Sequence, residues 1–246
     1  GDGSETWRYA SKLTKVTLNK SVQNVSGAWF KYGSSQLQEV LGPDRDDVKF
    51  YNGCIYNGDY SKLIYWPGGK PYSEELLKTD EEGNCVIKCI GERAFSSKTM
   101  PSIITIPNSV TKIEEWAFYG VITSHINIHE NVHLSSYSFY GSKMSTIDIA
   151  TSYFDGVSIF NSCTNLKTIK LHNLTTLPDS TFNSCSQLES VDLPDSLQII
   201  NGSVFTNTAL KSITIPLNVT EIGKNCFWGC KKWGDINCLP IKAPFL

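Results

Sequence analysis

The sequence predicts a β-rich repeat solenoid, and three observations support this fold. Two successive stretches, 188–209 and 210–232, share the frame L-x-x-(I/V)-x-(I/L)-P-x-x-(V/L)-x-x-I-x-x-x-x-F. Further copies recur along the chain with a period of 22 or 23 residues. Within each copy the apolar residues alternate just before the proline, as they do in a strand with one buried face. A fixed period of this length is typical of stacked coils, in which each coil contacts only its neighbours.

Each copy is expected to form one coil of the stack. The alternating apolar residues form a strand, and the proline that follows removes a backbone donor and ends the hydrogen-bond ladder. The later Val or Leu, the Ile and the Phe return the chain along the opposite side of the coil. A single coil buries too little apolar surface to offset the entropy lost on ordering its residues. Stability must therefore come from stacking, with neighbouring strands paired at about 4.8 Å.

Copies of the frame are spread over the whole chain, which predicts a single solenoid over residues 1–246 with about eight coils. Residues 122–165 follow the frame only loosely. Residues 233–246 match the start of one more copy, so we expect a last strand and a C-terminal tail there. Other copies that keep the frame well lie at 13–35, 101–121 and 166–187.

The main irregularity is an insertion over residues 44–77. It holds two short runs rich in β-forming residues, 54–56 and 62–66. The loop between them contains Asn57-Gly58, and such a loop favours a β-hairpin. We therefore predict an inserted β-hairpin that projects from the coil stack or packs beside it.

Composition excludes some classes of partner. The net charge is −2, and only 19% of the residues are charged. The chain has no run of basic residues, so we expect no nucleic-acid partner. It also has no apolar run long enough to span a bilayer, so we expect membrane association only through an N-terminal anchor that this sequence lacks.

The eight cysteines allow two interpretations. A disulfide framework is typical of small secreted domains without a sufficient core, and this chain is larger than that. Cys163, Cys185 and Cys230 occupy the same phase of their copies, which favours buried free thiols. The remaining spacings lack the pattern of a zinc ribbon. We therefore predict no structural zinc and no cofactor.

The frame can be extended to L-x-x-I-x-I-P-x-x-V-x-x-I-G-x-x-A-F-x-G-C, and it then resembles the BspA-like leucine-rich repeats. These repeats occur in surface proteins of gut and oral Bacteroidetes and of some parasitic protists. Residues 213–216, 219–223 and 227–230 carry the resemblance, and residues 104–120 carry it nearly as well. The insertion also resembles an interruption common in such arrays. Between residues 122 and 160 the proline and glycine of the frame are absent.

The resemblance implies a fold and a general function. The fold would be a curved, right-handed, β-rich α/β stack of leucine-rich-repeat coils, with a parallel sheet on the concave face and irregular or short helical turns on the convex face. The function would be non-catalytic adhesion or recognition at the extracellular or outer cell surface. The sequence itself shows no G-x-S-x-G, H-E-x-x-H, P-loop or dinucleotide-binding motif.

The residues between the apolar positions of each strand are expected to face away from the core, in rows that cross the sheet. Such faces of solenoids commonly bind partners. We therefore predict that this ladder binds a protein or glycan, such as one of host extracellular matrix or of other cells, and that the protein is a monomer. The candidate binding residues are His125, Asn127, His129, Asp148, Lys170, His172 and Asp192.

Three of the four histidines fall on this ladder, which raises the alternative of a metal site. His129 and His172 are two coils apart, about 9–10 Å by the strand spacing. His125 and His129 are about 13 Å apart along one strand. Zinc ligands must converge at about 2 Å from the ion, so solvated histidines are favoured over a metal site.

The aromatic residues of the insertion form a second candidate site. Tyr56, Tyr60, Tyr65 and Trp66 could contact a glycan or protein, or they could pack the hairpin onto the coils. Packing is favoured, because alternation turns half of a strand's side chains towards the core. A structural spacer, without a ligand of its own, remains the alternative function for the whole array.

Overall fold

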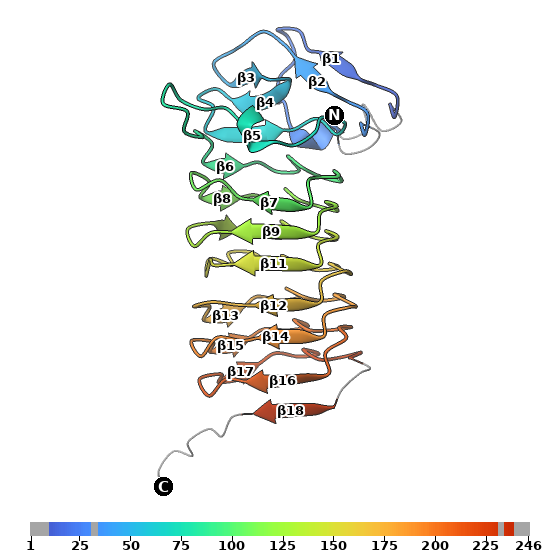
Figure 1. The fold of residues 1–246 in the computed structure, drawn as a ribbon, viewed down its shortest axis with the longest axis vertical. Helices are drawn as coiled ribbons and strands as arrows, with labels where there is room; N and C mark the ends of the chain where they lie inside the picture. The colour runs from blue at the N-terminus through green and yellow to red at the C-terminus, as the bar shows by residue number, and fades with distance from the viewer. Residues whose placement is uncertain (1–9, 31–33, 231–233, 239–246) are drawn as a thin grey trace.

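The predicted repeat solenoid is confirmed by the computed structural model, which describes residues 10–30, 34–230 and 234–238. The chain winds into about nine turns of parallel strands with nearly no helix, where about eight coils were predicted. Figure 1 shows the coils stacked as one column, with the insertion near the N-terminal end. The expected tail after the last strand lies outside the described residues.

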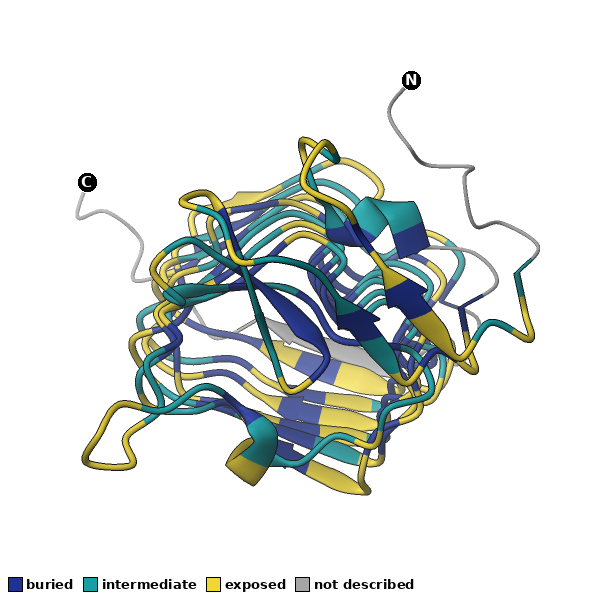
Figure 2. Cartoon of the chain, turned by 90° about the horizontal axis from the view of Figure 1, so that it is seen from above, coloured by how far each residue is buried: buried dark blue, intermediate teal, exposed yellow. Residues whose placement is uncertain are grey.

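One side of the column is a five-stranded parallel sheet, which we call the ladder sheet. Its strands are paired in register, so equivalent residues of successive coils lie side by side. Along each strand, exposed and buried residues alternate as predicted, and Figure 2 shows this alternation in a view down the stack. The strands are β7 (Ile103–Thr105), β9 (His125–Ile128), β11 (Thr146–Ile149), β12 (Thr168–Lys170) and β14 (Ser190–Asp192).

The ladder side continues beyond this sheet. Strand β16 (Ser212–Ile215) pairs in parallel with β18 (Asp235–Cys238), which is the last strand that the sequence predicted. At the other end of the column, β1 (Lys15–Thr17) and β2 (Glu39–Leu41) form a separate parallel pair.

The opposite side of the column, where irregular or short helical turns were expected, carries two-residue strands joined by turns. After the proline turn only two residues per coil extend before the next turn, too few for a helix, and their β-branched and apolar side chains favour strand pairing. These two-residue strands are β6 (Cys89–Ile90), β8 (Lys112–Ile113), β10 (His133–Leu134), β13 (Thr176–Leu177), β15 (Ile199–Ile200) and β17 (Glu221–Ile222). In the coil between β10 and β13 only an isolated bridge, Leu134 to Phe154, continues the pattern. The frame is loosest in this part of the sequence.

Helix is limited, within the described ranges, to two short 3-10 turns. These are η1 (Gly27–Phe30) and η2 (Glu74–Leu76). Neither is long or apolar enough to be a candidate membrane span.

A stack of phenylalanines forms the spine of the core. The ring centroids of neighbours from Phe95 to Phe227 are 4.9–5.9 Å apart, and the ring planes of each pair lie within 26° of parallel. In each of these coils the residues two before and two after the Phe have positive φ. This explains the frame glycine two residues after the Phe, because glycine adopts positive φ without steric cost. The frame Phe therefore lies between two left-handed residues that turn the chain around it.

The predicted hairpin is present, but it does not project. Strands β4 (Cys54–Asn57) and β5 (Lys62–Tyr65) pair antiparallel, and β3 (Val48–Tyr51) adds a further antiparallel strand through a tight turn at Asn52-Gly53. Strand β5 also pairs in parallel with β6 of the next coil. The insertion is thus built into the stack as the end of its second sheet.

The insertion lies between two hydrophobic clusters. Cys54, Tyr56 and Trp66 belong to the large core that runs down the column. Ile55 and Tyr65 belong to a smaller core formed with the first coils. Both faces of the insertion are therefore covered.

The stacked cysteines are buried free thiols, as predicted. Cys163, Cys185 and Cys230 are each at most 8% exposed. Each thiol donates a hydrogen bond to the carbonyl of a Phe in the preceding coil, at 3.2, 3.2 and 3.0 Å respectively. The cysteine of the frame thus bonds one coil to the next.

Candidate functional site

The exposed side of the ladder sheet carries a hollow of about 380 Å³. Five of the seven predicted ladder residues line it, and the strand pairing explains how they meet there. The five are Asn127, His129, Asp148, Lys170 and His172.

Four of the predicted residues stand in a single row across the sheet. Strand register places Asn127 beside Asp148, Asp148 beside Lys170, and Lys170 beside Asp192. Thr105 continues the row on β7, next to Asn127. The side chains of Asp148, Lys170 and Asp192 are 66–78% exposed, so their polar groups are open to a partner.

Each charged group of this row lies near a neighbouring polar side chain. The Lys170 ammonium lies 3.8 Å from Asp192 Oδ2, a distance typical of a weak, exposed ion pair. Asp148 Oδ2 lies 3.5 Å from His125 Nε2, on the other side. Asp148 and Lys170 are neighbours in register, but each lies near a different partner.

His125 is held by its neighbours at the edge of the hollow. Its Nε2 donates to Asn127 Oδ1 at 2.8 Å, and its Nδ1 accepts from the Thr146 hydroxyl at 2.7 Å. The amide oxygen of Asn127 can only accept, which sets this tautomer. The Asn127 amide nitrogen donates in turn to Thr105 Oγ1 at 3.3 Å. This network orders Asn127 before any ligand arrives.

The other two ladder histidines, His129 and His172, line the hollow. His129 donates from Nε2 to the Pro107 carbonyl at 3.1 Å and accepts from the Asn131 amide at Nδ1, at 3.4 Å. His172 is exposed. Register places the small side chain of Ala150 between these two histidines.

Metal binding receives no structural support from the described residues. Among them, no three His, Cys, Asp or Glu side chains are grouped closely enough to hold an ion. His125 and His129 use both ring nitrogens in contacts with the chain. The ladder without a metal stays a prediction.

For three of the four insertion aromatics the structure agrees with packing, the favoured interpretation, and leaves no exposed ring for the alternative of a binding site. Tyr56 and Trp66 are 0% exposed and Tyr65 is 2% exposed. Alternation predicted that one half of these side chains would be buried, but the second core covers the other half as well. Tyr60 is partly buried, packed edge-on to Tyr51 with centroids 6.5 Å apart. The insertion aromatics are packing residues.

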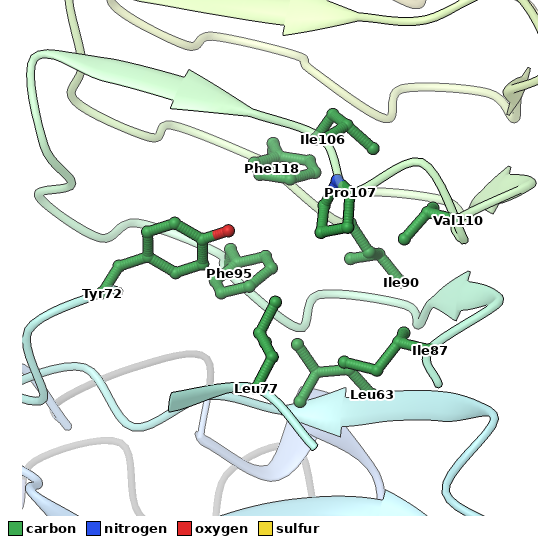
Figure 3. Close-up of a pocket in the computed structure, with 10 residues that line it drawn as sticks. All are labelled: Leu63, Tyr72, Leu77, Ile87, Ile90, Phe95, Ile106, Pro107, Val110 and Phe118. Carbon is green, nitrogen blue, oxygen red and sulfur yellow. The ribbon is translucent and has the colours of Figure 1, made fainter. Parts of the chain in front are cut away.

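A second cavity lies inside the column beneath the insertion (Figure 3). Its volume is only about 10 Å³, the size of one water molecule at most. Figure 3 shows apolar and aromatic side chains around it, such as Leu63, Phe95 and Ile106. It is a gap in the packing and cannot hold an organic ligand.

Comparison with known protein families identifies the repeat. Residues 84–155 and 134–234 match the BspA type leucine rich repeat region, in six copies, and the match spans more than half of the chain. The chain belongs to this family. No curated protein matches it.

Solved structures with the same fold come from bacterial leucine-rich repeat proteins. The BspA-type chain is similar to a leucine-rich repeat protein from Eubacterium ventriosum, with a TM-score of 0.72 and 24% identity over 88% of this chain, and it spans 58% of that protein. It is also similar to a leucine-rich repeat protein from Bacteroides ovatus, with a TM-score of 0.53 and 23% identity over 95% of this chain and 74% of that one. At these identities the likeness shows the fold.

The BspA-type frame explains why the hollow lies where it does. The frame proline ends the ladder strand in well-matched coils, as at Pro107, Pro194 and Pro216. In the three coils between Pro107 and Pro194 this place is taken by His129, Ala150 and His172. Ala150 is smaller than proline, and the two histidines carry polar rings instead of an apolar one. The departure from the repeat frame thus produces both the depth and the polarity of the hollow.

Two polar or aromatic groups were missed by sequence reasoning. His133 Nδ1 bonds Asp155 Oδ2 at 2.6 Å, and its ring stacks on Tyr153 at 4.2 Å. The turns around the frame Phe of successive coils form a further side of the column, which we call the turn side. There, Trp116 stacks on Tyr137 with centroids 4.3 Å apart and planes 3° from parallel. Both groups join residues about one period apart in the sequence. Aligning the loose coils by their Phe positions, rather than by their strands, would have placed Trp116 and Tyr137 together.

Proposed function

We propose that this BspA-type chain is a non-catalytic recognition module of the extracellular or outer cell surface. It binds a protein or glycan ligand, on host extracellular matrix or on other cells, through the ladder face. The observation that carries the proposal is the hollow where the repeat frame is broken, lined by half-buried Asn127 and by exposed Asp148, Lys170 and His172.

The physical features of the hollow fit recognition. Asn127, Asp148 and Lys170 stand on strands that are paired on both sides, so little backbone entropy is lost when a ligand binds. His125 and His129 use their ring nitrogens to orient neighbours, so neither is placed as a general base. Family membership supports the surface location, because BspA-like repeats are those of surface proteins.

Charge reversal on the ladder tests the proposal. The variants Asp148→Arg and Lys170→Glu are compared with Glu115→Arg and Lys224→Glu, which change exposed residues outside the ladder sheet. Binding to immobilised matrix proteins, to polysaccharides and to whole cells is measured by biolayer interferometry and flow cytometry. We expect the ladder variants to lose about tenfold or more in affinity and the controls to keep it.

The same experiment addresses the alternative of a structural spacer. If binding to every surface is equal for the ladder variants, the controls and the unmodified protein, the ladder is not the binding face. If the unmodified protein binds nothing in the panel, the array is a spacer and the proposal is wrong.

A further inference from the structure

We propose that the ligand of the ladder face is an extended, uncharged, β-linked glycan that lies along the stack, with one sugar unit over each coil. This inference rests on the proposed function and names the ligand class of the same site. Two independent features carry it, namely the spacing of the ladder rows and the order of their polar groups.

The first feature is the spacing. The ladder sheet has five strands in register, so each row repeats at the distance between strands, about 4.8 Å. One pyranose unit of an extended β-1,4-linked chain advances by nearly this distance. An extended peptide presents side chains to one face every two residues, about 6.6 Å, and loses register with the rows after one or two coils. The central row consists of Thr105, Asn127, Asp148, Lys170 and Asp192.

The second feature is the order of donors and acceptors. Successive units of a β-1,4-linked glycan are turned over, so the hydroxyl groups that face the protein alternate in position. The central row supplies both kinds of partner along its length, since Asp148 and Asp192 accept, Lys170 donates, and a sugar hydroxyl can meet either. In the neighbouring row Thr146, Thr168 and Ser190 supply hydroxyls that can act in either sense. A row of this kind can bind each sugar by at least one hydrogen bond.

The charge of the central row and the small side chain of Ala150 restrict the class of glycan that fits the site. The exposed charges of the central row are two carboxylates and one ammonium, which repel an acidic polysaccharide. Ala150 lines the hollow with a small side chain, which leaves room for the exocyclic group of a hexose. We therefore assign the site to a neutral hexose polymer and not to a uronate- or sulfate-bearing glycan.

The aromatic cluster on the turn side fits a sugar less well. A sugar stacks on the open face of a ring, but Trp116 has Tyr137 on one face at 4.3 Å and the Arg93 guanidinium 5.0 Å from its centroid. Tyr119 and Tyr140 are also stacked on each other, with centroids 5.8 Å apart. These rings cover one another's faces, and the ladder is the better site.

Oligosaccharides of increasing length test the proposal. Neutral β-1,4-linked gluco- and manno-oligosaccharides, from disaccharide to heptasaccharide, are titrated into the protein by calorimetry. We expect affinity to rise with each unit up to the pentasaccharide and then to level off, because the ladder sheet has five strands. Malto-oligosaccharides, whose α-linked chain curves, and oligouronates of equal length serve as ligand controls and are expected to bind at least about tenfold more weakly.

Single substitutions locate the binding. Asn127→Ala, Asp148→Ala and Lys170→Ala are each expected to weaken the pentasaccharide about tenfold, while Glu115→Ala leaves it unchanged. Circular dichroism and urea midpoints check that every variant is folded. Equal weakening by Glu115→Ala, or no weakening by the ladder variants, would place the glycan elsewhere and overturn the inference.

The outcomes separate this inference from the proposed function. Ladder-dependent binding of matrix proteins, with no binding of any neutral oligosaccharide, overturns the glycan but leaves the recognition face in place. Preferential binding of oligouronates, or affinity that does not depend on length, overturns the assignment of a neutral extended chain. Loss of all ladder-dependent binding overturns both.

Discussion

The insertion and the ladder hollow both depart from the repeat frame, yet one became core and the other surface. In the insertion, the residues that replace the frame are aromatic, and two cores cover them from both sides. In the hollow, the residues that replace the frame proline lie at the end of strands whose outer face is open. The comparison teaches that a break in the repeat indicates a site only where the strand has one uncovered face. Four predictions test it, in order of their expected effect on stability.

Truncation of an insertion aromatic should have the largest effect. Trp66 is fully buried, and its indole N–H donates to the Lys70 carbonyl at 3.1 Å. Trp66→Ala is expected to lower the free energy of unfolding by about 3–5 kcal/mol, because it leaves a cavity in the large core. The measurement is the urea midpoint. Asp148→Ala, in the hollow, should change stability by less than about 0.5 kcal/mol, and a similar loss for both variants would erase the distinction.

A buried lysine beside the insertion gives the second effect. Lys98 is 4% exposed, its ammonium lies over the Tyr65 ring at 4.5 Å, and burial lowers its pKa to about 7. Above that pH the unfolded chain keeps a proton that the folded protein has lost, so this residue makes stability rise with pH until the pKa of the unfolded lysine. Between about pH 7.5 and 9, we expect the free energy of unfolding, measured by urea denaturation, to rise by about 2 kcal/mol relative to that of Lys98→Met.

The comparison with Lys98→Met is needed because buried tyrosines and thiols also titrate at high pH. Burial raises the pKa of Tyr65 and of Cys54, so their contributions fall with rising pH in both proteins. Lys98→Met should also be more stable than the unmodified protein at neutral pH. Identical pH slopes for the two proteins would contradict the assignment of the slope to Lys98.

The ion pair that joins the insertion to the next coils should have a smaller effect. Lys62 Nζ lies 2.7 Å from a Glu114 oxygen, and Glu114 also accepts from the Glu92 amide at 3.0 Å. Burial acts to raise the pKa of Glu114, but these hydrogen bonds and the Lys62 charge outweigh it and hold the pKa below its usual value. Glu114→Gln is expected to cost about 1 kcal/mol at neutral pH.

The pH dependence of that variant provides its control. A carboxylate with a lowered pKa stabilises the folded state above its unfolded pKa, and this stabilisation is lost as the pH falls through the folded pKa. The difference between Glu114→Gln and the unmodified protein should therefore shrink in acid. A difference that stays constant between about pH 7 and 3 would show that the loss is one of packing.

Filling the hollow should leave stability almost unchanged. Ala150 is exposed between His129 and His172, so a larger side chain there meets solvent and not the core. Ala150→Trp is expected to change the free energy of unfolding, measured by urea denaturation, by no more than about 0.5 kcal/mol. It is also expected to abolish ladder-dependent binding. A matched substitution on the turn side, Glu115→Trp, should keep binding. Retained binding by Ala150→Trp would show that the hollow is not the site.

Sequence patterning predicted the fold because the repeat places the same residue types at the same phase. Ile126, Ile147 and Ile169 are buried, while their polar neighbours are half-buried beside Ile126 and exposed beside the other two, as alternation requires. The same alternation placed Asn127, Asp148 and Lys170 in one row. Strand register follows directly from the frame, so contacts between equivalent residues could be predicted.

Contacts that depend on the exact length of a coil could not be predicted. The bond between His133 and Asp155 joins β10 to the next coil, which lacks the usual two-residue strand. The burial of Tyr65 depends on the smaller core, which it forms with residues of the first coils. Those residues are distant from Tyr65 in the sequence, so the pattern around Tyr65 does not predict the contact. Burial of Lys98 has the same origin, because a charged residue in a polar stretch gives no sign of what will cover it.

Because the insertion packs into both hydrophobic cores, it affects how the terminal coils separate from the column. In an array of independent coils, terminal coils can separate and re-form without disturbing the rest, so backbone amides near the ends exchange quickly with solvent. Here, separation of the first coils, with β1 and β2, would expose Ile55 and Tyr65 of the insertion. The same segment of the insertion places Cys54, Tyr56 and Trp66 in the larger core. The N-terminal end is thereby locked to the coils that follow, and fraying should be confined to the opposite end of the column.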